Sequence, residues 1–320
     1  MKQYYTAYLK TNEEITDFFA VRMIAVKIGS NKKQYLDLIL ADNTGEITGK
    51  KWDISDLELP SLNMIQEGDV VKIKASVTEW NGLRQLRIAR LRKAVDQDEV
   101  DRTDFIKAAP EPSDAMYEFI LDEAEQIKDE DLRGIAVKLL SDNKEKLMYY
   151  PAAAKNHHAE MGGLLYHMKR MLMMGNRYCE VYANLNKSLV VTGVIVHDIE
   201  KLNEMISDCD GVVSGYSFEG QMLGHIIQGI KTIDKLAEEL DVPREKAIML
   251  EHMILSHHYE PEFGSPKKPL FPEAELLHYL DIVDARMYDM EEALIGVNKG
   301  EFSDKVRTLD FRRLYKPDAF

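Results

Sequence analysis

Residues 70–91 read VVKIKASVTEWNGLRQLRIARL. Between Val71 and Val77 every second residue is apolar and the residues between them are lysine or serine, which is the period of two of a half-buried strand. Asn81-Gly82 then supplies the dipeptide that most favours a two-residue hairpin turn, and the residues after it form the return strand. The stretch therefore predicts a β-hairpin with one buried face and one basic face.

Three further strand-like runs lie upstream, at 15–28, 34–41 and 46–52, and the turn sequence DNTG separates the last two. Five strands within about eighty residues, with an insertion between the third and fourth, predict a small closed barrel, for which the OB-fold is the commonest solution. We expect an all-β OB-fold domain over residues 1–93.

The rest of the chain has helical periodicity. Residues 94–114 are acidic and then proline-bearing, so they are expected to be a linker. An all-α domain is predicted over 115–300, with no strand, followed by a polar tail at 301–320. The helices expected beyond the first one fall at 130–147, 162–182, 187–199, 218–240, 243–258 and 272–297.

Composition sets limits on function. The 320 residues are 45% hydrophobic and 30% charged, and no apolar leader or membrane-spanning run is visible, so we expect a cytoplasmic protein without a membrane partner. Cys179 and Cys209 are too few for a disulfide framework or a cysteine-rich zinc site. Any metal site must therefore use histidine and carboxylate ligands.

Charge is divided unequally along the chain. The net charge is −14, but residues 1–93 carry 15 basic and 12 acidic residues, against 26 and 43 in the remainder. An overall acidic chain therefore still allows a basic nucleic-acid-binding groove in the barrel.

All nine histidines lie between His157 and His278. His197-Asp198 ends the apolar segment TGVIVHDIEK, and most of the others also lie on apolar helices. Burying many imidazoles is costly unless their nitrogens are satisfied, and a shared metal site satisfies several at once. Each position alone is more often a hydrogen-bonded core histidine, so the order along the chain carries the argument.

That order, His, His-Asp, His, His-His, Asp, resembles the HD-domain superfamily of metal-dependent phosphohydrolases, in particular members that hold two metals. The resemblance implies that Asp198 bridges the two ions. The first ion would be held by His167, His197, Asp198 and Asp281, and the second by Asp198, His225, His257 and His258. Imidazole and carboxylate ligands suit Mn, Fe or Zn better than Mg.

Other polar residues leave alternatives open. Lys201 either meets the phosphate or is a solvated helix-end lysine. His157 and His158 either line the substrate pocket or form a surface pair, and Asp284 competes with Asp281 as a ligand. His252 and His278 are expected to be supporting or structural residues.

Longer motifs narrow the resemblance. The segments ADNTGEITGKKWD, NHHAEMGGLLYH, VIVHDIEK, GHIIQG and ILSHHYEPEFGSP are similar to the YhaM-type exoribonucleases, from about residue 15 to about residue 297. This implies a two-metal 3′→5′ exonuclease, with manganese preferred, that releases nucleoside 5′-monophosphates from single-stranded RNA and also acts on single-stranded DNA. Glu200 stands where the family usually has glycine, which leaves the role of Lys201 in question.

In the barrel, aromatic rings could stack on bases and cations could follow the phosphates. The candidates are Phe18, Phe19, Tyr35, Trp52, Trp80, Lys27, Lys50, Lys51, Arg84 and Arg87, and about half of the aromatics are expected in the core.

Two other functions remain open at this stage: an HD phosphohydrolase of nucleotides or cyclic dinucleotides, and a non-catalytic single-strand-binding protein. Assembly into a homo-oligomer is also left open.

Overall fold

The computed structural model describes residues 2–29, 33–52, 54, 58–62, 64–80, 82–101, 104–154 and 158–319. The chain divides into two compact units, which are described separately. The first contains residues 1–107 together with 293–320, and the second contains 108–292.

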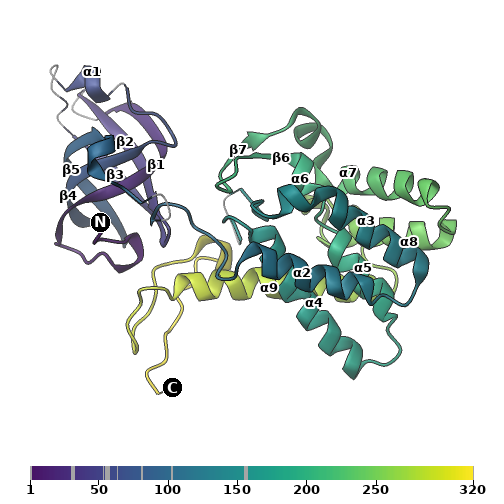
Figure 1. The fold of residues 1–320 in the computed structure, drawn as a ribbon. Helices are drawn as coiled ribbons and strands as arrows, with labels where there is room; N and C mark the ends of the chain where they lie inside the picture. Colours follow the sequence, from purple (N-terminus) through teal and green to yellow (C-terminus); the bar gives the residue numbers. More distant parts are fainter. Residues whose placement is uncertain are drawn as a thin grey trace. The chain divides into compact units, whose positions relative to one another are not determined.

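A closed five-stranded barrel forms most of the first unit (Figure 1). Its strands are β1 (Glu14–Ile28), β2 (Gln34–Asp42), β3 (Gly45–Lys51), β4 (Val70–Trp80) and β5 (Leu83–Lys93). They close in the order β1-β2-β3-β5-β4, with β3 and β5 parallel and the other pairs antiparallel. The short helix α1 (Leu59–Leu62) lies between β3 and β4. The predicted OB-type barrel is confirmed.

Apolar side chains at alternate positions along the strands fill the interior of the barrel. Leu38, Ile73 and Leu86 come from three different strands and are fully buried in one apolar cluster. Gly49 faces the same interior, where a Cβ would lie 2.8 Å from the Ile88 side chain. The period of two therefore sends one set of side chains inward and leaves the alternate set on the outer face.

The second unit is helical, as predicted (Figure 1). Its helices are α2 (Ser113–Glu125), α3 (Glu130–Leu147), α4 (Gly163–Val181), α5 (Lys187–Val196), α6 (Lys201–Glu204), α7 (Phe218–Glu239), α8 (Arg244–Ser256) and α9 (Pro272–Ala293). Helix α5 packs against α2, α3, α4 and α8. Every residue from Leu189 to Val196 is buried, because the sequence offers this helix no polar face.

The structure differs from the sequence-based expectation at two places. A small hairpin, β6 (Met205–Ser207) and β7 (Val213–Tyr216), interrupts the helices. Its strands have three and four residues, too few for a visible alternation. Helix α9 ends at Ala293, and the residues after it group with the barrel unit, so the predicted boundary at 300 lies inside that segment. Among the described residues, no helix has the length and apolar character needed to cross a membrane.

Helix α7 contains a break at Gly224, whose φ of 66° and ψ of 167° lie far from helical values. This backbone region is open almost exclusively to glycine. We expect Gly224→Ala to destabilise the helical unit by about 1–3 kcal/mol, because any Cβ strains this conformation. Gly215→Ala is the matched control, since a Cβ there meets no atom within 4 Å. Urea unfolding of both variants tests this, and equal stabilities would contradict it.

Candidate metal centre

Helix ends bring the candidate ligands together. Both His197 and His257 occupy the position directly after a helix, at the ends of α5 and α8. His225 follows the break in α7, while His167 and Asp281 lie within α4 and α9. Five helices spread over residues 163–293 therefore contribute to one site.

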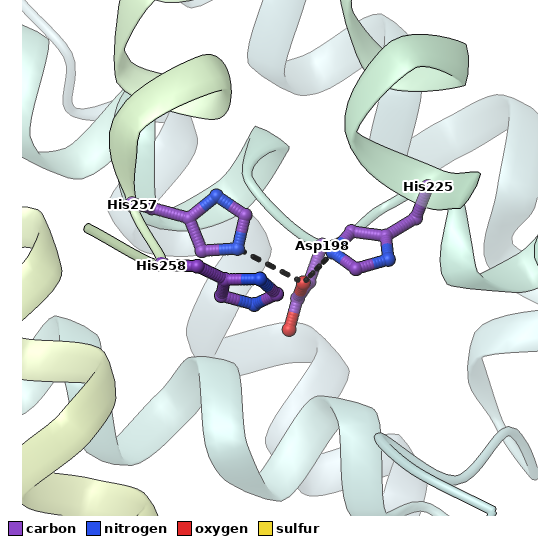
Figure 2. Close-up of side chains that lie close together, drawn as sticks. All are labelled: Asp198, His225, His257 and His258. Atoms are coloured by element: carbon purple, nitrogen blue, oxygen red, sulfur yellow. Dashed lines mark ion pairs between the residues drawn. The ribbon is translucent and has the colours of Figure 1, made fainter. Parts of the chain in front are cut away.

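Asp198 lies at the middle of the site, and its two oxygens face different groups. Figure 2 shows it with one of these groups, His225, His257 and His258. Its Oδ1 is 3.4 Å from His225 Nε2 and 3.7 Å from His257 Nε2. Its Oδ2 is 3.3 Å from His197 Nε2 and 3.9 Å from His167 Nε2. One carboxylate thus serves two sets of imidazoles, one set at each oxygen.

The clusters in which all ligand atoms lie within 4.8 Å of one another follow the same division between the two oxygens. Asp198 with His225, His257 and His258 forms one such group, and Asp198 with His167 and His197 forms another. The remaining predicted ligand, Asp281, has Oδ1 3.4 Å from His167 Nε2. All seven predicted metal-binding residues therefore meet in one place.

Three of these histidines are oriented by main-chain carbonyls. A carbonyl only accepts, so the Nδ1–H must donate and the lone pair is left on Nε2, the atom that a metal would use. The pairs are His197 with Val194 (2.8 Å), His257 with Ile254 (2.7 Å) and His258 with Phe263 (2.7 Å).

The other two histidines are oriented by carboxylates. His225 donates from Nδ1 to Glu204 at 3.0 Å and also from its main-chain nitrogen at 3.2 Å. His167 Nδ1 lies 2.7 Å from Asp284 Oδ2. Each of the two ligand groups therefore contains one imidazole made more basic by a carboxylate.

Several buried ligand atoms of the site lack a hydrogen-bond partner among the residues that the structure describes. Within the described part of the chain, Nε2 of His197, His225 and His257 and Oδ1 of Asp198 are buried and have no hydrogen-bond partner. Such burial is unfavourable for polar atoms, and it is relieved when they coordinate a cation. The residues present thus fit divalent metal ions.

Charge states also suit metal binding. Burial alone would raise the pKa of Asp198, but Lys201 and His197 hold it well below its usual value. Burial, with the nearby His258 and His197, lowers the pKa of His257 well below its usual value. The carboxylate is therefore ionised and this imidazole neutral, as ligands must be.

His167 behaves differently. Its burial would lower its pKa, but hydrogen bonds and Coulomb attraction to Asp281 and Asp284 outweigh burial and raise it to about 10. At neutral pH, His167 therefore holds a proton that a metal ion would have to displace.

Lys201 is buried, and its Nζ lies 2.7 Å from Asp198 Oδ2, so it is no solvated helix-end lysine. Asp284 accepts at Oδ2 from His167 and His158 and forms an ion pair at Oδ1 with Arg170. These contacts make Asp284 a support for His167 and leave Asp281 as the carboxylate that faces the centre.

The remaining histidines have structural partners. His158 is fully buried against Asp284, which fits neither a surface pair nor an open pocket; His157 lies outside the described residues. His252 accepts from the Leu270 main chain at 3.0 Å, and His278 donates to the His257 carbonyl at 2.7 Å.

Glu200 does not enter the centre. Its two oxygens accept from Thr232 at 2.8 Å and Asn203 at 2.7 Å. Its φ of −77° requires no glycine, so the backbone accepts glutamate without strain. Lys201 is therefore placed against Asp198 in spite of the substitution.

Sequence reasoning missed Glu204. It lies in the polar segment KLNE, where nothing in the spacing distinguishes it from a solvated carboxylate. Its role depends on the approach of α7, where the main chain of Gly220 would not leave room for a Cβ beside Glu204.

On the barrel, Tyr35 and Trp52 stack with ring centroids 4.2 Å apart. Lys50 Nζ lies 5.7 Å from the first ring and 6.0 Å from the second. Lys50 also pairs with Arg87 in the β3–β5 register. Outward residues of β2, β3 and β5 thus place two rings and two cations close together.

The other barrel candidates vary in exposure. Trp80 is 68% exposed, and the exposed Lys27 forms an ion pair with the buried Asp37. Lys51 is buried and paired with Glu58 at 3.0 Å, and Arg84 donates to the Leu9 carbonyl. Phe18 and Phe19 are buried aromatics of the kind expected in the core.

Known proteins resemble the whole chain. A family model described as HD domain matches residues 164–286. The 3′-5′ exoribonuclease YhaM of Halalkalibacterium halodurans is 35% identical over 311 residues, which cover 97% of this chain and 95% of that protein. Proteins of the same name from Geobacillus sp. and Bacillus subtilis are 37% and 35% identical over 308 residues, covering 96% of this chain and 93% and 96% of theirs.

Among solved structures, the second OB-fold domain of replication protein A from Methanococcus maripaludis is 17% identical, with a TM-score of 0.23, and the match covers 31% of this chain and 98% of that domain. The barrel assignment rests on its strand order instead. Because identity of 35–37% extends over nearly the full length of both chains, this chain belongs to the YhaM family of 3′-5′ exoribonucleases.

Proposed function

We propose that this protein is a cytoplasmic 3′→5′ exoribonuclease that releases nucleoside 5′-monophosphates from single-stranded RNA, with single-stranded DNA as a second substrate. The observation that carries the proposal is Asp198, whose two oxygens face two separate sets of imidazoles. Membership of the YhaM family supports the direction of degradation.

The two ligand groups would hold two divalent ions bridged by Asp198. The first would use His167, His197, Asp198 and Asp281, and the second would use Asp198, His225, His257 and His258. A mixed set of imidazoles and carboxylates suits manganese, iron or zinc better than magnesium. Among these, manganese is preferred on the resemblance to the YhaM-type enzymes. When bound, such a pair of ions provides a hydroxide near neutral pH and neutralises charge on a phosphate.

The protein's own groups do the remaining work. Burial of the site excludes bulk water, which strengthens electrostatic interactions within it. Lys201 lies against Asp198 Oδ2. Although burial lowers the pKa of Lys201, the Asp198 carboxylate raises it overall, so the ammonium stays charged. We assign Lys201 to stabilise negative charge that develops on the phosphate.

We further propose that the outer face of β2, β3 and β5 binds the strand. In OB-folds the face of the second and third strands commonly binds oligonucleotides. Tyr35 and Trp52 offer ring faces, and Lys50 and Arg87 offer charge. Lys27, the register partner of Tyr35, extends this surface. Trp80 pairs with Leu83 toward the other end of β5, and Lys51 and Arg84 are engaged within the barrel unit, so these three residues are left out of it.

Asp198→Asn should abolish degradation of 5′-labelled single-stranded RNA in manganese, while oligonucleotide binding is retained. Metal-ion stabilisation is worth several kcal/mol and about 1.4 kcal/mol is tenfold, so a loss of roughly 1,000-fold or more is expected. His225→Ala should lose less, because it removes a ligand from one ion only. Asp142→Asn, at an exposed position on α3, is the control. Substantial hydrolysis by Asp198→Asn with both ions bound would refute the bridging role.

Metal binding at pH 8 should release about one proton from His167, since its pKa is raised to about 10. Asp284→Asn removes one of the carboxylates that raise this pKa, so the variant should release fewer protons at the same pH. Titration calorimetry in two buffers of different ionisation enthalpy measures the number. Protons released from metal-bound water are common to both proteins, so equal release would contradict the assignment.

Trp52→Ala should weaken binding of a twenty-nucleotide RNA by roughly 5- to 100-fold, as expected for the loss of one base–ring stack. Tyr8→Ala is the control. Tyr8 is 60% exposed but follows Ala7, which bonds to Thr44 at the opposite end of the β2–β3 hairpin. Fluorescence anisotropy with a chelator present separates binding from cleavage. Equal affinities for the two variants would exclude this face.

A further inference from the structure

Among the described residues, the candidate ligands differ in exposure. Side chains of His167, His197, Asp198 and His257 are at most 2% exposed. By contrast, His225 is 10% exposed, Asp281 is 15% exposed, and His258 is partly exposed. A substrate must therefore reach the centre past these three residues.

The segment 259–270, here called the strap, adjoins two of these three residues, His258 and His225. It starts directly after His258 and is fixed to it twice. The His258 main chain donates to Ser265 Oγ at 3.1 Å, and its Nδ1 donates to the Phe263 carbonyl at 2.7 Å. A Cβ on Gly264 would lie 3.3 Å from Ile226, the neighbour of His225. The strap is therefore held between the two more exposed histidines.

Phe263 is conspicuous in this position. Its carbonyl is tied to a candidate metal ligand, yet its side chain is 69% exposed. The strap forms a 3-10 turn over Pro261–Phe263, ended by Gly264 with a φ of 96°. The turn fixes the backbone, so the exposed ring is presented by an ordered segment.

Lys268 on the same strap is also exposed, and its Nζ lies 4.4 Å from the centre of the Tyr259 ring. Tyr259 in turn packs on His278 with ring centroids 4.7 Å apart, and His278 donates to the His257 carbonyl. Lys268 is thus connected through Tyr259 and His278 to the candidate metal ligand His257.

We propose that the strap binds the 3′-terminal nucleotide of the RNA, with the Phe263 ring stacked on its base and Lys268 at an adjacent phosphate. This inference rests on the exonuclease function proposed above and adds a substrate-binding element within the helical unit. It is distinct from the outer face of the barrel.

RNA is the occupant that the local chemistry favours. Residues 94–320 carry 26 basic and 43 acidic residues, so an approaching RNA is repelled by most of this part of the chain. The adjacent lysines Lys267 and Lys268 place positive charge on the strap, although Glu260 and Glu262 precede them. A single exposed ring matches one unpaired base, because every base has a face on which a ring can stack.

The test compares two twenty-nucleotide RNAs, one with a normal 3′-terminal nucleotide and one with an abasic 3′ terminus. The unsubstituted enzyme should cleave the abasic RNA with a kcat/KM lower by roughly 5- to 100-fold, the range for loss of one stack. Phe263→Ala should cleave both RNAs at the same low rate, and Phe263→Tyr should restore the difference.

Two controls separate this role from damage to the centre. Tyr178→Ala removes a partly exposed ring eleven residues beyond His167 on α4, roughly 16 Å along the helix, and should behave like the unsubstituted enzyme. On the abasic RNA, which has no terminal base to stack, Phe263→Ala should match the unsubstituted enzyme.

Lys268→Ala should raise KM for RNA without changing kcat and should reduce the slope of log affinity against log salt by about one. Lys268→Arg should retain most of the affinity. Lys235→Ala, at an exposed lysine ten residues beyond His225 on α7, is the matched control.

The outcomes are distinguishable. If the unsubstituted enzyme cleaves RNA but the abasic effect persists in Phe263→Ala, the strap assignment is wrong and the exonuclease function stands. If no phosphodiester is cleaved with manganese, the proposed function itself fails. If Phe263→Ala changes the mass measured by light scattering and leaves RNA kinetics unchanged, the ring belongs to a contact between protein chains, which also overturns the inference.

Discussion

An ionised carboxylate buried among helices is the constraint on which the helical unit depends. Asp198 is 1% exposed, and a charge at that depth is tolerated only when opposite charges or ligands surround it. Lys201 supplies one compensating charge, and four imidazoles approach the two oxygens of Asp198. The apolar helix α5 carries Asp198 into the core, so the other helices must bring polar groups to it, from the end of α8 and from within α4 and α7.

The groups behind the ligands divide into two kinds. Main-chain carbonyls orient His197, His257 and His258, and they are insensitive to side-chain replacement. Carboxylates of Glu204 and Asp284 orient His225 and His167, and each brings a full negative charge. One imidazole in each ligand group is therefore tuned by a side chain, so the metal affinities of the two ligand groups can be adjusted separately.

Regular patterns in the sequence predicted the barrel and the long helices, and the resemblance to the HD-domain superfamily supplied the set of candidate ligands. The burial of Lys51 could also have been predicted from the sequence. Ile47, Gly49 and Lys51 share one face of β3, whereas Lys50 lies on the other face, as does Trp52 directly after the strand. The β6–β7 hairpin was too short to leave a periodic signal. The roles of Glu204 and Asp284 arise only when separate helices approach one another, and local sequence holds no record of that approach.

His197 and His257 are held in the same way: each immediately follows a helix and bonds to the carbonyl three residues before it. The direction of each ring is therefore set by where its helix stops. One residue added to or removed from α5 or α8 would turn the following imidazole by about 100° around the helix axis. Insertions and deletions should consequently be confined to the connecting loops during divergence, and these two helices should keep their length even where their side chains change.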